Sequence, residues 1–365
     1  MSFLLSKEAR EVAKILVEYS TKVKAGDRVQ IAADMPAYEM ALEVYRLALM
    51  KGAYPWIKLD PPGRRYVFFK HASEDQLKHL PEHELYEIKH TDVYIAIRAP
   101  ANVRELSGID PARISTWLKT VEPISEWRVS KTRWVVFYYP TQALAQEADM
   151  SLSEFEEFVF SSCLLDWPKL AEEMKKVKQL LEKTDEVRIL GEETDIRFSV
   201  KGRKAVVAAG EKNMPDGEVF TSVVEDSVEG EVYFDIPAIY AGNAIEGVKL
   251  RFESGAVTEA KAERNQRLLE KLLATDSGAR RLGEFGIGLN YRITRPVKSI
   301  LFDEKIGGTI HLAIGRGYEE TLSKNKSAIH FDLIKDLRKE GEVYFDGELV
   351  MKQGRWLMLA AGPEP

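Results

Sequence analysis

Cysteine is almost absent from this sequence of 365 residues, which contains a single one, Cys163. One thiol cannot form an internal disulfide, which excludes a disulfide-stapled secreted scaffold and favours a reducing compartment. Cys163 lies in the apolar segment EFVFSSCLLDW and is interpreted as a small buried hydrophobe rather than a nucleophile.

The sequence also lacks an excess of positive charge and long apolar runs. Lysine and arginine number 52 against 58 aspartates and glutamates, a formal net charge of -6, whereas binding driven by phosphate neutralisation needs clustered Lys and Arg. No stretch reaches the ~18 apolar residues that a membrane-spanning helix needs, and the apolar patch in MSFLLSKEAR is too short for a secretory signal. We therefore expect no nucleic-acid partner, no membrane association and a cytoplasmic location.

What the sequence does contain is ordinary for a folded protein, with 45% hydrophobic and 30% charged residues. A chain of this length exceeds the size to which one hydrophobic core usually grows. We predict an N-terminal domain over residues 1–185 and a C-terminal domain over residues 186–365.

The first domain shows helical and strand patterns in alternation. The expected elements are a helix over 6–25, a strand over 28–34, a helix over 35–52, and strands over 53–60, 92–99 and 133–140. The strands are apolar runs, as in a sheet that is covered on both faces. This pattern predicts an α/β domain with a mostly parallel sheet.

The second domain is predicted to be an α+β, strand-rich metal-binding domain. A helical stretch over 151–183, divided by Pro168, leads into it. Short alternating strands follow, with a hairpin turn at Ser254-Gly255 and a helix near 264–275.

Histidines number six, and four of them fall in the segment FKHASEDQLKHLPEHELYEIKH over residues 69–90. Pro81 interrupts any helix that could present two of them as ligands at positions i and i+4, and no HExxH motif occurs. We interpret this segment as a charged, solvated helical surface.

The other two histidines lie in apolar strands, in GGTIHLAIGRGY and SAIHFDLI. Alternation along a strand points His330 and Asp332 to one face. With His311 they suit a metal chelate; the alternative is a core histidine paired with Asp332. Glu218, Glu284 and the pair Asp303-Glu304 stand in Gly-rich, weakly charged segments, and each alone has a structural interpretation too. Such carboxylate and imidazole sets bind Zn²⁺, Mn²⁺ or Co²⁺, and carboxylates can bridge two ions in a hydrolase.

These segments resemble peptidase family M29, the aminopeptidase T and aminopeptidase S group, in the order in which that family has them. The matching blocks are GEVFT with Glu218, LGEFGIGLN with Glu284, FDEKIGGTIHLAIGRGY with Glu304, His311 and Tyr318, and NKSAIHFD with His330 and Asp332. Two features depart from the family pattern. The pair Asp303-Glu304 stands farther from its histidine than in the best-known members, and the segment between Tyr318 and His330 is short.

The resemblance implies a metal-dependent aminopeptidase with two divalent ions, Zn, Co or Mn, which acts on peptides with a free N-terminus. Glu284 would bridge the ions and act in catalysis, while the other ligands would be Glu218, Glu304, His311, His330 and Asp332. Tyr318 would donate a hydrogen bond to the oxyanion, unless it is a packed aromatic at a strand end. The family also implies a homodimer.

Two other functions remain open. His311, His330 and Asp332 alone form the two-histidine, one-carboxylate set of Fe(II) oxygenases, and ring-opening dihydroxypyridine dioxygenases resemble this peptidase family. Glu218 and Glu284 favour the peptidase because a single iron does not need them. The third possibility is a non-catalytic binding or assembly protein on the same scaffold, which the complete set of expected ligands argues against.

Overall fold

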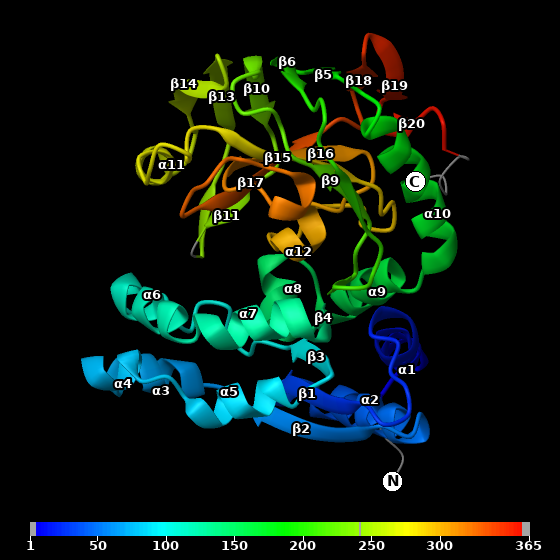
Figure 1. Ribbon diagram of the computed structural model, residues 1–365, viewed down its shortest axis with the longest axis vertical. Helices are drawn as coiled ribbons and strands as arrows, with labels where there is room; N and C mark the ends of the chain where they lie inside the picture. The colour runs from blue at the N-terminus through cyan, green and yellow to red at the C-terminus, as the bar shows by residue number, and fades with distance from the viewer. Residues whose placement is uncertain (1–4, 241, 360–365) are drawn as a thin grey trace. The chain divides into compact units, whose positions relative to one another are not determined.

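The computed structural model describes residues 5–240 and 242–359, and its contacts divide the chain into two units (Figure 1). One unit comprises Met1–Leu164 with Gly210–Pro215, and the other comprises Leu165–Ala209 with Asp216–Pro365. The predicted boundary between residues 185 and 186 remains a prediction. Among the described residues, no helix is both long and apolar enough to cross a membrane.

The first unit is built on a five-stranded parallel sheet in the order β2-β1-β3-β4-β8. Its strands are β1 (Arg28–Asp34), β2 (Tyr54–Asp60), β3 (Val93–Arg98), β4 (Arg133–Tyr138) and β8 (Asn213–Met214). Its helices are α1 (Lys7–Lys14), η1 (Ile15–Ser20), η2 (Met35–Ala37), α2 (Tyr38–Met50), α3 (Arg64–His71), α4 (Glu74–Lys78), α5 (Glu82–Lys89), α6 (Pro111–Thr120), α7 (Glu122–Lys131), α8 (Gln142–Glu147) and α9 (Leu152–Cys163). The expected α/β domain is confirmed.

The strands and helices predicted for this unit closely match the observed ones, because the apolar runs that predicted them are buried. Residues 29–33 of β1 are all buried, as expected for a strand that is covered on both faces. All four histidines of the segment 69–90 are exposed, and Pro81 precedes α5, so this segment is the solvated helical surface that we expected. Cys163 is fully buried, and burial raises the pKa of its thiol.

The break in the predicted 151–183 helical stretch is also present. Helix α9 ends at Cys163 and α10 (Trp167–Leu181) begins with Pro168 in its first turn. The missing N–H of proline costs no hydrogen bond there, which is why the proline starts a helix instead of bending one. Helix α10 belongs to the second unit.

The second unit contains an eight-stranded sheet in the order β14-β13-β10-β6-β5-β18-β19-β20 and a five-stranded sheet in the order β17-β16-β15-β9-β7. The larger sheet contains β5 (Glu186–Gly191), β6 (Thr194–Ser199), β10 (Glu229–Phe234), β13 (Val248–Glu253), β14 (Ala256–Lys261), β18 (Glu342–Phe345), β19 (Glu348–Lys352) and β20 (Arg355–Trp356). The smaller contains β7 (Ala205–Ala208), β9 (Glu218–Thr221), β15 (Leu282–Gly288), β16 (Thr309–Gly315) and β17 (His330–Asp336). Strands β11 (Ala238–Tyr240) and β12 (Asn243–Ile245), and helices α11 (Gln266–Leu273), α12 (Ile300–Asp303) and η3 (Glu319–Thr321), complete the unit. Both large sheets are antiparallel, so the strand-rich prediction is confirmed.

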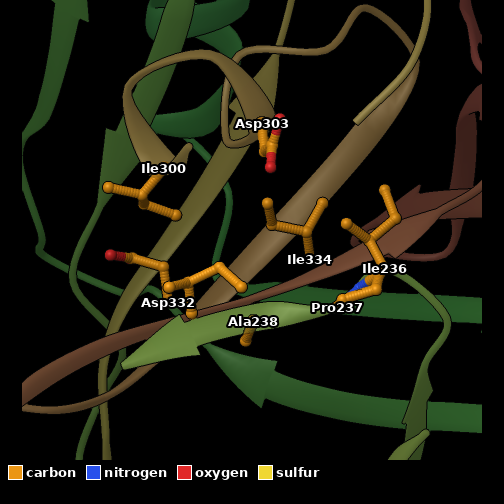
Figure 2. A pocket seen from close by; sticks show the side chains of 8 residues that line it. Ile236, Pro237, Ala238, Ile300, Asp303, Asp332 and Ile334 are labelled. Carbon is orange, nitrogen blue, oxygen red and sulfur yellow. The ribbon is translucent and has the colours of Figure 1, made fainter. Parts of the chain in front are cut away.

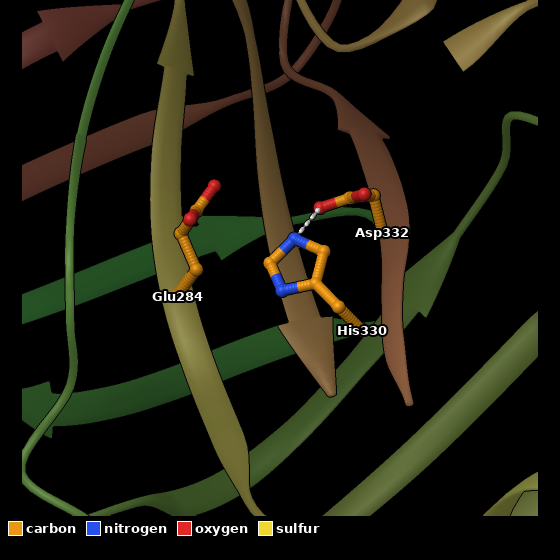
Figure 3. Close-up of side chains that lie close together, drawn as sticks. All are labelled: Glu284, His330 and Asp332. Atoms are coloured by element: carbon orange, nitrogen blue, oxygen red, sulfur yellow. Dashed lines mark ion pairs between the residues drawn. The ribbon is translucent and has the colours of Figure 1, made fainter. Parts of the chain in front are cut away.

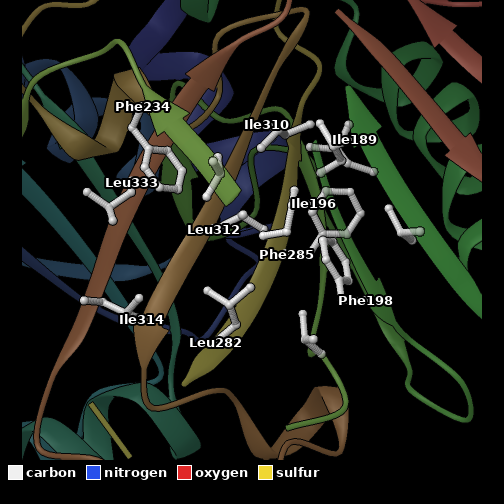
Figure 4. Close-up of a cluster of buried hydrophobic side chains, with 14 of the residues drawn as sticks. Ile189, Ile196, Phe198, Phe234, Leu282, Phe285, Ile310, Leu312, Ile314 and Leu333 are labelled. Atoms are coloured by element: carbon white, nitrogen blue, oxygen red, sulfur yellow. The ribbon is translucent and has the colours of Figure 1, made fainter. Parts of the chain in front are cut away.

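One face of the five-stranded sheet lies in the core of this unit. Figure 4 shows Phe285 of this sheet beside Ile196 and Phe198 of the larger sheet, and Leu333 of this sheet beside Phe234 of the larger sheet. The rings of Phe198 and Phe285 meet edge to face, with centroids 5.2 Å apart. Because side chains alternate along a strand, the residues next to these core positions point to the opposite face, where the polar residues collect.

Candidate metal centre

The predicted ligands project from neighbouring strands of the five-stranded sheet. Glu218 begins β9, Glu284 lies in β15, His311 lies in β16, and His330 and Asp332 lie in β17. These strands are adjacent in the order β17-β16-β15-β9. The sheet therefore brings together five side chains that are spread over more than a hundred residues of sequence, from Glu218 to Asp332.

Small residues lie opposite these ligands on the neighbouring strands. Gly286 is paired with His311, and Ala313 is paired with both Glu284 and Asp332. A Cβ atom on Gly286 would lie 1.9 Å from Nε2 of His311. The glycine-rich character of β15 therefore provides the space that the imidazole occupies.

A β-bulge determines the direction of Glu284. The register between β15 and β16 shifts between Leu282 and Glu284, so these residues, two apart in sequence, do not share a face. Leu282 packs in the core while Glu284 faces the ligand cluster. Bulges commonly re-aim a side chain in this way beside functional sites.

The first group of ligand atoms contains Glu284, His330 and Asp332. One ligand atom from each residue lies within 4.8 Å of the other two, and Figure 3 shows the three side chains converging from β15 and β17. The His330 Nε2 atom is 3.2 Å from Asp332 Oδ1. A cation held here would contact an imidazole nitrogen and two carboxylates.

A second group of ligand atoms shares Glu284 with the first. The Nε2 atom of His311 lies 3.2 Å from Glu284 Oε1 and 3.6 Å from Glu218 Oε2. Glu284 thus lies between two pairs of side chains. One pair is His330 and Asp332 on β17, and the other is His311 on β16 with Glu218 on β9. That is the position expected of a bridging carboxylate.

Both histidines present Nε2 to the carboxylates. The Nδ1 atom of His311 lies 3.2 Å from the Glu304 carbonyl oxygen, and Nδ1 of His330 lies 2.6 Å from the Arg316 carbonyl oxygen. A carbonyl can only accept, so Nδ1 must carry the proton in each ring. Backbone partners of this kind fix the orientation of metal-binding histidines and leave Nε2 as the ligand atom.

Three carboxylate oxygens of the cluster are buried without a hydrogen bond among the described residues: Glu218 Oε2, Glu284 Oε2 and Asp332 Oδ1, of which the last has an ion-pair contact with His330 Nε2. Leaving a buried polar atom without a partner costs about 1–3 kcal/mol, and more for a charged one. Cations in the two groups would give these oxygens partners. Carboxylate and imidazole donors suit Zn²⁺, Co²⁺ and Mn²⁺, so the residues fit divalent metals.

Burial and mutual charge shift the acid–base properties of these groups. Burial raises the pKa of Glu218 to about 8, against the opposing effect of Lys305, and burial also raises the pKa of Glu284. Burial lowers the pKa of His311, but Glu284 and Glu218 outweigh it and raise that pKa to about 9. Asp332 similarly outweighs burial and raises the pKa of His330 to about 10. In the protein alone, the histidines and the two buried glutamates therefore retain protons to higher pH than usual, and a metal ion would displace those protons.

Glu304 lies beside this cluster and is paired with a lysine. It follows α12, and its carboxylate forms an ion pair with the ammonium of Lys305. The same Lys305 Nζ lies 3.4 Å from Glu218 Oε1. Lys305 is fully buried, and sequence analysis did not select it. The signal for it was its place beside Glu304 in a segment that we already considered part of the site.

Tyr318 lies at the edge of the ligand cluster. Its ring centroid is 5.1 Å from that of His330 and 5.7 Å from that of Phe220, and the residue is 42% exposed. Partial desolvation and the charges of Glu284 and Asp332 raise the pKa of its hydroxyl. The hydroxyl therefore stays protonated at neutral pH and is available as a donor.

A small cavity of about 10 Å³ borders Asp332 on another side, which is room for one water molecule. It is lined by Ile236, Pro237, Ala238, Ile239, Ile300, Asp303, Asp332 and Ile334 (Figure 2). Asp303 accepts hydrogen bonds from the backbone N–H groups of Val297 (2.7 Å) and Ser299 (3.1 Å). Its carboxylate therefore fixes the loop before α12, and no ligand role is needed to explain it.

A family model and individual relatives of known name point to the same protein family. The model of the thermophilic metalloprotease family M29 matches residues 5–356. The chain is 27% identical to Aminopeptidase 2 of Geobacillus stearothermophilus, over 96% of this chain and 98% of that protein. It is 34% identical to Aminopeptidase T of Thermus thermophilus over 40% of each chain.

Two solved structures share the fold. Wild-type AmpT from Thermus thermophilus has a TM-score of 0.86 at 22% identity, with 96% of this chain and 99% of that chain covered. The 2,5-dihydroxypyridine dioxygenase from Pseudomonas putida KT2440 has a TM-score of 0.64 at 15% identity, with 97% and 99% covered. At these identities the likeness shows a shared fold.

Proposed function

This chain belongs to the M29 family of thermophilic metalloproteases, and we propose from that premise that it is an aminopeptidase which removes the N-terminal residue of peptides. Relatives that are named as aminopeptidases match this chain over nearly their whole length. The observation that carries the proposal is the position of Glu284 between two pairs of imidazole and carboxylate groups. One shared carboxylate with a separate histidine on each side suits two adjacent cations.

The proposed ligand set follows from these contacts. His330 and Asp332 would hold one divalent ion and His311 and Glu218 another, with Glu284 shared between the two groups of ligand atoms. The chemistry that zinc, cobalt or manganese would supply at these residues is a coordinated water of lowered pKa and polarisation of the scissile carbonyl. The sixth predicted ligand, Glu304, is engaged by Lys305.

Tyr318 is proposed to donate its hydroxyl proton in a hydrogen bond to the oxyanion that forms when the carbonyl is attacked. Its place beside His330 and its protonated state at neutral pH support this role. Donors to an oxyanion contribute about 10²–10³ in rate. The Phe220 and His330 rings hold the phenol from two sides, so it is positioned without being enclosed.

The mononuclear Fe(II) dioxygenase is less well supported. That chemistry needs His311, His330 and Asp332 around one ion, but the described residues whose ligand atoms converge within 4.8 Å are Glu284, His330 and Asp332. This set contains one histidine, and Nε2 of the other points to Glu284 and Glu218. His311 therefore lies beside Glu218 and Glu284, two carboxylates that a mononuclear iron site does not require.

Metal-free protein supplemented separately with Zn²⁺, Co²⁺ or Mn²⁺ tests the proposal. We expect cleavage of unblocked aminoacyl arylamides and short peptides, and resistance of the N-acetylated forms. Equal turnover of blocked substrates would identify an endopeptidase or amidase. Oxygen uptake with Fe(II) and a dihydroxypyridine, without peptidase activity, would establish the dioxygenase. The homodimer expected from the family is tested by light scattering on the same preparation.

A further inference from the structure

Lys305 is a buried cation inside the proposed metal centre. Its side chain is 0% exposed, and its Nζ atom lies between Oε1 of Glu218 and Oε1 of Glu304. Asp216 adds a further negative charge nearby. A buried lysine is stable only with compensating charges, and here the compensating groups include one proposed metal ligand.

The backbone holds Lys305 in this place. Its carbonyl oxygen accepts the Asn290 N–H at 3.0 Å, and Asn290 forms a parallel bridge with Ile306. A Cβ atom on Gly288 would lie 2.1 Å from the Ile306 carbonyl oxygen. The glycine at the end of β15 thus allows the segment that carries Lys305 to lie directly against the sheet.

Contact with Lys305 makes the two oxygens of Glu218 unequal. Oε1 is 3.4 Å from the ammonium, whereas Oε2 is buried without a hydrogen-bond donor among the described residues and lies 3.6 Å from His311 Nε2. Oε2 is therefore the oxygen directed at the ligand cluster. The Glu304 carboxylate, in contrast, has an ammonium as its close partner.

We propose that Lys305 is a positioning residue of the metal centre: its ammonium holds Glu218 by one oxygen, so that Glu218 offers only the other to a metal ion, and it retains Glu304 as a counter-ion outside the coordination shell. This inference rests on the proposed function because it assumes that the cluster binds metal. It assigns Glu304 a role different from the ligand role that the family resemblance implies.

The fixed ammonium has two opposite effects on a metal centre. It repels nearby cations, which weakens metal binding, and it keeps two carboxylates from occupying positions that water and substrate need. Replacing it with an isosteric neutral side chain frees Glu218 and Glu304 to coordinate. Metal affinity should then rise while turnover falls.

The experiment compares the full-length wild type with Lys305→Met, Lys305→Arg and Glu304→Gln, each prepared metal-free. Zinc affinity and stoichiometry are measured by competition with a chromophoric chelator, and melting temperature is measured with and without zinc. For Lys305→Met we expect zinc affinity about tenfold or more above wild type, a larger zinc-induced rise in melting temperature, and a fall in kcat larger than any change in KM. Lys305→Arg keeps the charge and should stay within about threefold of wild-type zinc affinity.

Glu304→Gln separates a counter-ion from a ligand and does not depend on the lysine variants folding. We expect it to bind as many zinc ions as the wild type, because Glu304 contributes no ligand atom. Loss of one zinc equivalent in Glu304→Gln, or unchanged or weaker zinc affinity in Lys305→Met, would overturn the inference. If Lys305→Met does not fold, the stoichiometry of Glu304→Gln decides the matter. A wild type that binds no divalent metal would refute the proposed function itself.

Discussion

Gly286→Ala tests the geometry of the metal centre with a single methyl group. The new Cβ atom would lie 1.9 Å from Nε2 and 2.0 Å from Cε1 of His311, whereas ordinary contacts begin near 3.4 Å. The imidazole must therefore move by about 1.5 Å. His311 is fully buried, and its Nδ1 is held by the Glu304 carbonyl, so the ring cannot move away without breaking that bond.

The expected result is loss of the centre rather than loss of the fold. Overpacking a well-packed interior costs about 1–3 kcal/mol, which a protein of this size tolerates with a lower melting temperature. A displacement of about 1 Å at a reacting centre costs about 10² in rate. We therefore expect at least one metal equivalent to be lost and kcat/KM for an aminoacyl arylamide to fall by about 10² or more.

The assay combines metal analysis by mass spectrometry, arylamide kinetics and thermal denaturation. Gly108→Ala is the matched control, because a Cβ atom there would have no neighbour within 4 Å, and it should leave all three measurements unchanged. If Gly286→Ala retains the full metal content and activity, the close packing of His311 against β15 does not support the site.

Three further predictions concern the same centre. Glu284→Ala should abolish activity and at least one metal equivalent, since this carboxylate is shared by both groups of ligands; a variant that keeps the wild-type metal content excludes the bridging role. Tyr318→Phe should keep its metal and lose about 10²–10³ in kcat, and full activity would remove Tyr318 from the mechanism. Apparent zinc affinity should rise with pH up to about 9–10, because the pKa of His311 is raised to about 9 and that of His330 to about 10, and both must lose a proton to bind metal. Zinc titrations between pH 6 and pH 9 measure this, and an affinity independent of pH contradicts the proton balance.

Local patterns in the sequence were sufficient for most elements of the fold. The strand expected over 28–34 is β1, and its run of buried residues is what the apolar run indicated. The spacing of His330 and Asp332 was read correctly because alternation along one strand needs no knowledge of the neighbouring strands. Strand β8, two residues long, was not predicted, since so short a segment carries no periodic signal.

The assembly of the site depends on contacts between strands, which a single sequence does not display. The bulge that turns Glu284 away from the side of Leu282 belongs to the pairing of β15 with β16. The role of Gly286 follows from its position opposite His311. Lys305 was not selected from the sequence, and the backbone bridge between Asn290 and Ile306 that accompanies its burial is a contact between distant segments.

The arrangement of the five-stranded sheet explains how so many charged side chains can be buried together at the proposed metal centre. Its core face is filled by large apolar side chains such as Phe285 and Leu312, which stabilise the sheet without the ligands. Its other face carries acids and histidines that would be costly to bury alone. Lys305 offsets part of that charge permanently, and protons on the histidines offset more of it until metal replaces them. The sheet can therefore form without metal, and the buried carboxylate oxygens would attract the divalent ions that we propose.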